Sequence, residues 1–405
     1  MNAGSSVRRL VAAFLIAMAA AHAVAAWKER QQIARGYGDF SSLYTSGLMV
    51  RSGMGHQLYD RREQWRLQQE LFPEVAIRRG PIPFMRPPFE ALFLAGFSYF
   101  AYPTALAIWS AVNLALLGLT LWILKRSAPA LSVYPVWAET ILCLGLFPVF
   151  LDFYQGQDAL LLLFLVALSF RSLTLGRDGM AGLYLGLALF KFHLTLPIVI
   201  MLVLAGRRRV LAGFVPTAMG LMGVSCAIAG PSVLYLYPAY LLKLNHDAGA
   251  GMVTAQSMPN LRGLLTNWVG SAPYPGPIHW ALLPAAIAAM GYTAWAWKRK
   301  SKAGMAALVP GFSLALTTAI LTSYYAYCYD MTLLIVPLLL VGGGPSASTH
   351  MSAQTRKLLN AAALLLICTP LYWALTLRLN LLGLPILLLA AGLALALKES
   401  APAPS

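Results

Sequence analysis

The acidic residue Asp39 lies in the sequence GYGDF, a short distance after the first long apolar stretch of the chain. A carboxylate near a membrane surface can act as a general base that removes a proton from an attacking hydroxyl group. Because ionisable groups are costly in that setting, they indicate function by default. Asp39 is therefore the predicted catalytic residue. Its alternative role, as N-cap of a helix that begins at Phe40, does not exclude catalysis.

Two cations lie in apolar surroundings where they can meet a phosphate. Arg86 belongs to FMRPPF and Lys191 to LFKFH. Arginine binds phosphate with a forked geometry, and a lysine between phenylalanines needs an anion nearby. Asp330, in SYYAYCYD, is a predicted ion-pair partner of Lys191 or of an arginine. The alternative for Arg86 is an anchor to lipid headgroups.

Five further polar residues complete the predicted substrate-binding set: Gln157, Asp158, His193, Arg262 and Tyr329. Gln157 and Asp158 stand where a helix begins, so one of them can instead cap it. His193, taken alone, is more typical of a satisfied polar residue than of a catalytic one.

Together these residue types suit the transfer of a group from a lipid-linked phosphate to a hydroxyl acceptor. A departing phosphate gains negative charge, so nearby cations act most strongly in the transition state. An apolar groove beneath can hold a lipid tail. The motifs HExxH, CxxC, DxD, GxGxxG and GxxxxGK are absent, which argues against a metal motif and a nucleotide substrate. No cofactor is expected, with a divalent metal as the alternative.

The composition indicates which elements must position these residues. Of 405 residues, 59% are hydrophobic and 11% are charged, so lipid must solvate most of the chain. The net charge of +16 does not indicate nucleic acid, because Lys and Arg gather at the ends of apolar stretches, as membrane topology requires. The four cysteines have no spacing that suggests a disulfide framework or a metal site.

We predict an all-α polytopic membrane protein with about 12 transmembrane helices, within a range of about 11 to 13. The long apolar stretches are 10–26, 104–124, 210–229, 280–297, 304–322, 358–376 and 381–397. Shorter runs, which fit broken or tilted helices, are 135–151, 157–170, 179–190, 194–206 and 331–341. An uncleaved first helix is favoured over a signal peptide, and the topology is the same in either case.

With Arg8 and Arg9 in the cytoplasm, the basic junctions fall on the cytoplasmic side. Residues 1–400 then form one domain with two long extracytoplasmic loops, 28–90 and 230–279, and 401–405 are a disordered tail. The first loop should contain helices around 40–52 and 60–72, the second amphipathic and capped by Asp60. Residues 88–101 are predicted to be interfacial or re-entrant.

The ordered series GYGDFSSLY, LYDRR, RPPF, YQGQD, the Lys of LFKFH, MPNLRG and SYYAYCYD resembles glycosyltransferase family 87 over roughly residues 30–345. That resemblance implies a C-type glycosyltransferase fold, a polyprenyl-phosphate sugar as donor and inversion at the anomeric carbon. It also implies an acidic base in the first outer loop, and Asp39 is the matching position. Phe40 and Ser41 follow Asp39 where a second acid would be needed, so a paired-carboxylate or metal-bridged site is not implied.

The predicted function is transfer of a sugar, mannose or another hexose, from a polyprenyl-phosphate donor to a lipid or glycan hydroxyl. The active site would face the extracytoplasmic side of the inner (plasma) membrane. One alternative is a transporter or flippase of lipid-linked sugars, because carriers also have broken helices near mid-membrane. Carriers usually show internal repeats, and this sequence shows none. A scaffold subunit with a degenerate site is the other alternative.

Overall fold

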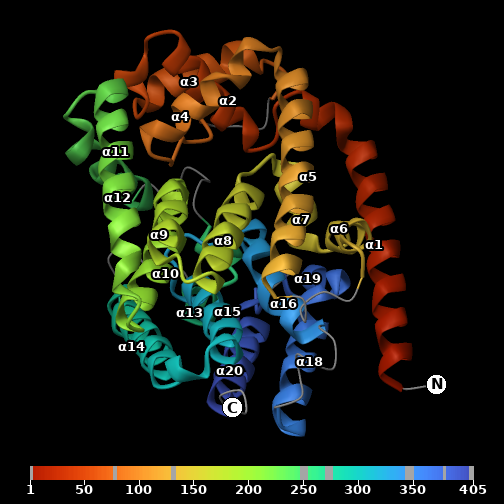
Figure 1. Cartoon of the computed structure of the whole chain (residues 1–405). Coiled ribbons are helices and arrows are strands. Elements are labelled where there is room, and N and C mark those ends of the chain that lie inside the picture. The colour runs from red at the N-terminus through yellow and green to blue at the C-terminus, as the bar shows by residue number, and fades with distance from the viewer. Residues whose placement is uncertain are drawn as a thin grey trace.

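The structure, a computed structural model, describes residues 3–75, 80–128, 134–246, 254–269, 277–342, 351–376 and 380–400. Over these ranges the protein is helical and contains no β-strand (Figure 1). The α-helices are α1 (Ala3–Ala34), α2 (Phe40–Arg51), α3 (Arg61–Leu71), α4 (Pro88–Ala95), α5 (Tyr102–Ser127), α6 (Val136–Leu144), α7 (Phe147–Gln155), α8 (Ala159–Thr174), α9 (Asp178–Leu187), α10 (Phe192–Leu204), α11 (Leu211–Ala229), α12 (Val233–His246), α13 (Leu261–Val269), α14 (Pro277–Arg299), α15 (Met305–Thr322), α16 (Ile335–Gly342), α18 (Ala353–Ile367), α19 (Thr369–Thr376) and α20 (Gly383–Glu399). Short 3-10 segments are η1 (Gly55–Gln57), η2 (Phe97–Tyr99), η4 (Ala188–Lys191), η5 (Arg208–Val210), η7 (Ala255–Ser257), η8 (Ser301–Ala303) and η9 (Cys328–Leu334).

Several helices are long and apolar enough to cross a membrane, which makes this a multi-pass membrane protein. Five stretches meet that description in the described ranges, or six if the pair α6 and α7, bent by 77°, forms one broken span. The five are Ser6–Ala34, Tyr102–Ser127, Asp178–Leu204, Arg208–Ala229 and Met305–Thr322. The predicted total of about 12 spans is not confirmed.

One of these five stretches folds back on itself. A straight helix over Asp178–Leu204 would hold its ends roughly 40 Å apart. Instead, Nη1 of Arg207 lies 2.9 Å from Oδ1 of Asp178, so the two ends meet. Helices α9 and α10 are therefore the legs of a hairpin, and Lys191 in η4 forms its tip. This arrangement agrees with the separate short runs predicted at 179–190 and 194–206.

Another predicted span is broken. The apolar run 358–376 was expected to be one helix, but it is divided between α18 and α19 at Cys368, whose backbone is extended. Pro370 follows closely and lacks the N–H group that a continuing helix needs. Hydrophobicity alone did not reveal this break.

Helices α2, α3 and α4 gather into a cap at one end of the molecule, opposite both termini (Figure 1). The predicted helices around 40–52 and 60–72 are confirmed as α2 and α3, and the Asp60 carboxylate accepts a 2.8 Å hydrogen bond from the Arg62 amide, as a cap should. Helix α4 has eight residues, about 12 Å, and is too short to span a membrane. The loop predicted to begin at residue 28 begins later, because α1 continues to Ala34.

The second predicted outer loop, 230–279, contains α12 and α13. Its segments 247–253 and 270–276 lie outside the described residues, as does the predicted tail 401–405.

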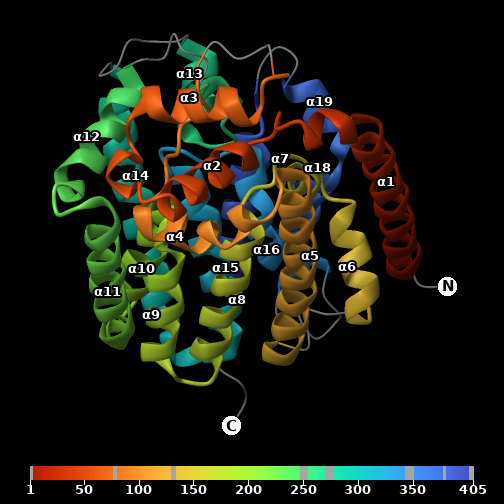
Figure 2. The ribbon, with the colours of Figure 1, turned by 90° about the horizontal axis from the view of Figure 1, so that it is seen from above.

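The helices that carry the polar motifs lie inside the bundle. Helix α15 is the most enclosed of the long apolar stretches, with 83% of its apolar window buried, against 11% for α1 and α11. Figure 2 shows α8 and α15 between α11 on one side and α5 with α1 on the other. Since α1 and α11 bury little surface against protein, their exposed apolar faces suit lipid.

Candidate active site

Three buried charges meet at the tip of the α9–α10 hairpin. The Lys191 side chain is fully buried, and its Nζ lies 2.7 Å from Oδ1 of Asp158 and 2.6 Å from Oδ1 of Asp330. Asp158 immediately precedes α8, and Asp330 belongs to η9. The anion that a buried lysine needs is thus supplied twice by the chain itself, and one of the two is the predicted partner Asp330.

Arg86 adds a second cation to this cluster. Its Nε and Nη2 donate hydrogen bonds of 2.9 and 3.0 Å to the two carboxylate oxygens of Asp158, a bidentate pair. Burial opposes ionisation of Asp158, but the charges of Arg86 and Lys191 outweigh it and hold the pKa of that carboxyl well below its usual range. Arg86 is only 12% exposed, which rules out the alternative of a headgroup anchor.

Gln157 connects Asp39 to this cluster. Its Oε1 accepts a 3.1 Å hydrogen bond from Nη2 of Arg86, and its Nε2 donates a 2.7 Å hydrogen bond to Oδ2 of Asp39. The Asp39 amide donates a 3.3 Å hydrogen bond to Oε1 of Gln155. Asp39 is half-buried, and its side chain makes no capping hydrogen bond to α2. The orientation of its carboxylate is therefore set by Gln157 rather than by a capping role.

The cap of α8 is supplied by a residue outside the predicted set. The Asp152 carboxylate accepts a 2.9 Å hydrogen bond from the Ala159 amide, whereas Asp158 makes no side-chain capping bond. Asp158 is thereby left to bind Arg86 and Lys191. The alternative that Gln157 or Asp158 caps this helix is wrong.

Sequence reasoning missed Glu90, a buried acid in α4. Its Oε2 lies 3.6 Å from Nε of Arg86, beyond hydrogen-bond distance, and has no hydrogen-bond partner in the described part of the chain. Burial, and then the neighbouring Asp158 carboxylate, raise the pKa of Glu90 well above its usual value. The available signal was an acid four residues after Arg86, within an otherwise apolar run.

A hollow of about 380 Å³, which includes space open to solvent, adjoins this network. Four predicted residues line it: Arg86, His193, Tyr329 and Asp330. The rest of the lining is apolar or aromatic: Met85, Phe192, Leu241, Tyr325 and Tyr327. A lining that combines charged with apolar and aromatic side chains suits a ligand with a polar head and an apolar tail.

Hydrogen bonds hold the wall of the hollow in place. Nδ1 of His193 lies 3.1 Å from Oγ of Ser323, and Nδ2 of Asn260 donates a 2.8 Å hydrogen bond to the Ser323 carbonyl. Nζ of Lys191 lies 4.8 Å from the centre of the Tyr329 ring. His193 is a satisfied polar residue, as its alternative reading proposed, and it also lines the hollow.

Arg262, in α13, lies behind this aromatic wall. Its Nη1 donates a 2.9 Å hydrogen bond to the Tyr324 carbonyl, and its guanidinium carbon lies 3.9 Å from the ring centre of Tyr324 and 5.6 Å from that of Tyr325. Tyr325 lines the hollow, but Arg262 itself is not a lining residue. All nine predicted residues therefore lie in or next to one network, with Arg262 at its edge.

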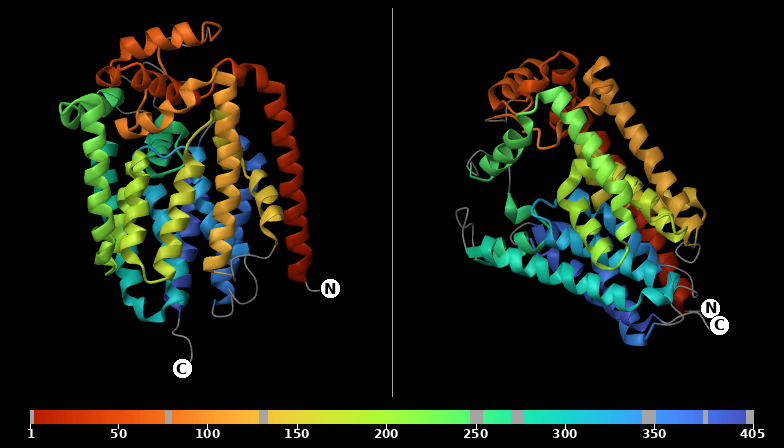
Figure 3. Two further views of the ribbon diagram at one scale, coloured as in Figure 1. Left: turned by 45° about the horizontal axis from the view of Figure 1, so that its top comes forward. Right: turned by 60° about the vertical axis from the view of Figure 1, so that its left-hand side comes forward.

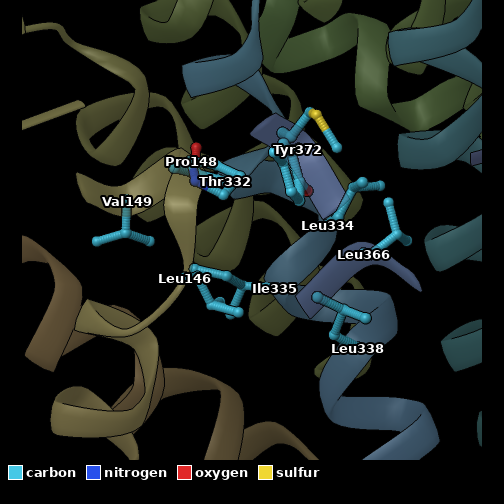
Figure 4. A pocket seen from close by; sticks show the side chains of 10 residues that line it. Leu146, Pro148, Val149, Thr332, Leu334, Ile335, Leu338, Leu366 and Tyr372 are labelled. Carbon is cyan, nitrogen blue, oxygen red and sulfur yellow. The ribbon is translucent and has the colours of Figure 1, made fainter. Parts of the chain in front are cut away.

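A second hollow, of about 250 Å³, is apolar (Figure 4). Its lining includes Leu146, Val149, Ile335, Leu338 and Leu366, and its side-chain hydroxyl groups belong to Tyr372 and Thr332. Among the described residues no acidic or basic side chain lines this hollow, in contrast to the first.

Neither hollow provides an evident metal site. Within the described ranges, no group of three or more His, Cys, Asp or Glu side chains could hold a metal ion. The four cysteines are free thiols.

Comparison with known proteins gives one match. The family model for glycosyltransferase family 87 matches residues 84–323, more than half of the chain. This range includes Arg86, Gln157, Asp158, Lys191 and Arg262, whereas Asp39 precedes it. No curated protein and no solved structure matches. The match and the apolar helices together identify a membrane glycosyltransferase, and the chain belongs to glycosyltransferase family 87.

Proposed function

We propose that the protein transfers a sugar, mannose or another hexose, from a polyprenyl-phosphate donor to a hydroxyl group of a lipid or glycan acceptor. Asp39 acts as the general base, and the anomeric carbon is inverted. The observation that carries this proposal is the continuous chain of contacts from Asp39 through Gln157 to Arg86, Asp158 and Lys191, beside a hollow with charged and apolar walls.

The reaction balances with these groups. The acceptor oxygen forms a bond to the anomeric carbon while the bond from that carbon to the phosphate oxygen breaks. The acceptor proton passes to the Asp39 carboxylate, and the electron pair of the broken bond leaves with the phosphate. No external oxidant, reductant or nucleotide is needed, and the added charge on the phosphate calls for a cation nearby.

The polarity of the bundle supports the proposal of an extracytoplasmic site. The cap that follows α1 stands at one end, and both termini lie at the other (Figure 3, left). Basic residues end α5, α14 and α20 and occupy the turn between α8 and α9. Since basic turns favour the cytoplasm, Asp39 would face outward, in the inner (plasma) membrane of a cell.

Replacement of Asp39 by Asn tests the proposal. The protein would be reconstituted in vesicles with several polyprenyl-phosphate sugars, and sugar transfer to added acceptors would be measured. Loss of a general base should reduce turnover by roughly 100-fold or more. Asp60→Asn is the matched control, because Asp60 lies in the same cap and Asn preserves helix capping.

Wild-type turnover by Asp39→Asn would refute Asp39 as the base. If the wild-type protein instead moves the lipid-linked sugar across the vesicle membrane without bond cleavage, the flippase alternative is the better account.

A further inference from the structure

We propose that Arg262 binds the phosphate of the donor, whereas Arg86 and Lys191 are positioning residues that fix the carboxylates around the site. This inference rests on the proposed function, because it assigns the phosphate of a polyprenyl-phosphate donor to one residue. It differs from the expectation drawn from the sequence, in which Arg86 and Lys191 were the two cations that can meet a phosphate.

The charges of Arg86 and Lys191 are already balanced. Lys191 touches two carboxylates, and Arg86 holds Asp158 through two hydrogen bonds. Two cations thus contact two carboxylates directly, Asp158 and Asp330, and burial raises the pKa of Glu90, which disfavours its charged form. A phosphate placed here would meet two cations that carboxylates already contact, with the Asp39 carboxylate nearby through Gln157. It would have to displace a bound carboxylate, which would leave that carboxylate buried without a partner.

Arg262 differs in each of these respects. It is 7% exposed, yet in the described part of the chain no carboxylate forms an ion pair with it, and its Nε is buried without an acceptor. Among the described residues, the acceptor of its side-chain hydrogen bond is the neutral Tyr324 carbonyl. A buried cation without an anion is costly, so the site is complete only when an anion is present.

The place of Arg262 suits that anion. The residue lies against Tyr324 and Tyr325, and Tyr325 lines the hollow beside His193 and Tyr329. Asn260, two residues earlier, fixes the same segment through the Ser323 carbonyl. In a site of low dielectric, the charge that develops on a departing phosphate is stabilised most by a cation that no carboxylate already neutralises.

The test uses the full-length protein in lipid nanodiscs and two probes, a short-chain polyprenyl monophosphate and the matching polyprenol. Dissociation constants are measured for both. The wild-type protein should prefer the phosphate. Arg262→Met should reduce this preference by roughly 30-fold or more while leaving polyprenol binding unchanged. Arg262→Lys should restore part of the preference, because lysine keeps the charge without the fork.

Arg35→Met is the matched control, since Arg35 is exposed and paired with Glu74. Unchanged polyprenol binding shows that a variant is folded. If Arg262→Met no longer binds polyprenol, the phosphate preference of Arg262→Lys is compared with that of the wild-type protein instead. Full phosphate preference in a folded Arg262 variant overturns the inference and leaves the proposed function intact. A wild-type protein that does not distinguish the phosphate from the alcohol overturns the polyprenyl-phosphate donor itself.

Discussion

Two cationic regions lie close to the same hollow, one through Arg86 in its lining and the other behind the lining residue Tyr325, and they differ in how their charge is balanced. At the hairpin tip, Arg86 and Lys191 are held by Asp158 and Asp330, with contacts of 2.6–3.0 Å. At the edge, Arg262 packs on tyrosine rings and is paired with no carboxylate of the described ranges. A buried cation near a substrate site is therefore not a substrate ligand by its position alone. Its partners decide its role.

The largest expected effect is on stability, at the hairpin tip. Lys191→Met leaves Asp158 and Asp330 buried without their shared cation, and breaking such a pair costs about 3–5 kcal/mol. Thermal unfolding in detergent should show a marked loss of stability, whereas Arg262→Met should change it far less.

The double variant Lys191→Met with Asp330→Asn serves as the control for this expectation. It should be less destabilised than the sum of the two single variants, because it removes an unpaired charge. If Lys191→Met is as stable as the wild-type protein, Lys191 does not stabilise the two buried carboxylates, and the two regions do not differ in how their charge is balanced.

The next effect concerns turnover. Gln157→Leu removes both the donor to Asp39 and the acceptor of Arg86, so the base loses its fixed orientation. The kcat should fall by roughly 10- to 100-fold with little change in KM. Gln155→Leu is the matched control, because Gln155 binds the Asp39 amide rather than its carboxylate. Equal losses in both variants would contradict a positioning role specific to Gln157.

The smallest effect is a pH dependence at Glu90. Burial and then Asp158 raise its pKa in the folded protein above the ordinary value of 4.5. The folded state therefore binds the proton more tightly, and stability falls as pH rises from about 4.5 through the raised pKa. Glu90→Gln carries no charge, so its stability relative to the wild type should increase across this window. Unfolding temperatures measured between pH 4.5 and pH 8 that run parallel for the two proteins would contradict this expectation.

Much of the local structure could be predicted from the sequence. Asp60 followed by a charged amphipathic run predicted α3 and its cap, and both are present. A lysine among phenylalanines requires an anion, and Asp330 was a predicted ion-pair partner of Lys191 or of an arginine; the structure pairs it with Lys191.

The arrangement of the spans could not be derived in the same way. A hairpin leg and a transmembrane helix are equally apolar, so hydropathy cannot count spans in a chain with broken helices. The ion pair between Arg207 and Asp178, which closes the hairpin, bridges distant positions that no periodicity connects.

The site was predictable as a set of residues but not as a network. Asp39 and Gln157 lie 118 positions apart, and their hydrogen bond depends on the packing of the cap over α7 and α8. Glu90 was missed because its nearest neighbours in the sequence are apolar, and only the fold brings it beside Asp158.

The most direct measurement is a cryo-EM structure of the protein in nanodiscs with a non-hydrolysable polyprenyl-phosphonate sugar. We predict phosphonate oxygens within about 3.5 Å of the Arg262 guanidinium, with the anomeric carbon between these oxygens and Asp39. The pairs of Lys191 with Asp158 and Asp330 should remain intact. A phosphonate bound by Lys191 or Arg86 in place of their carboxylates, with no phosphonate oxygen near Arg262, would contradict the assignment of the phosphate to Arg262.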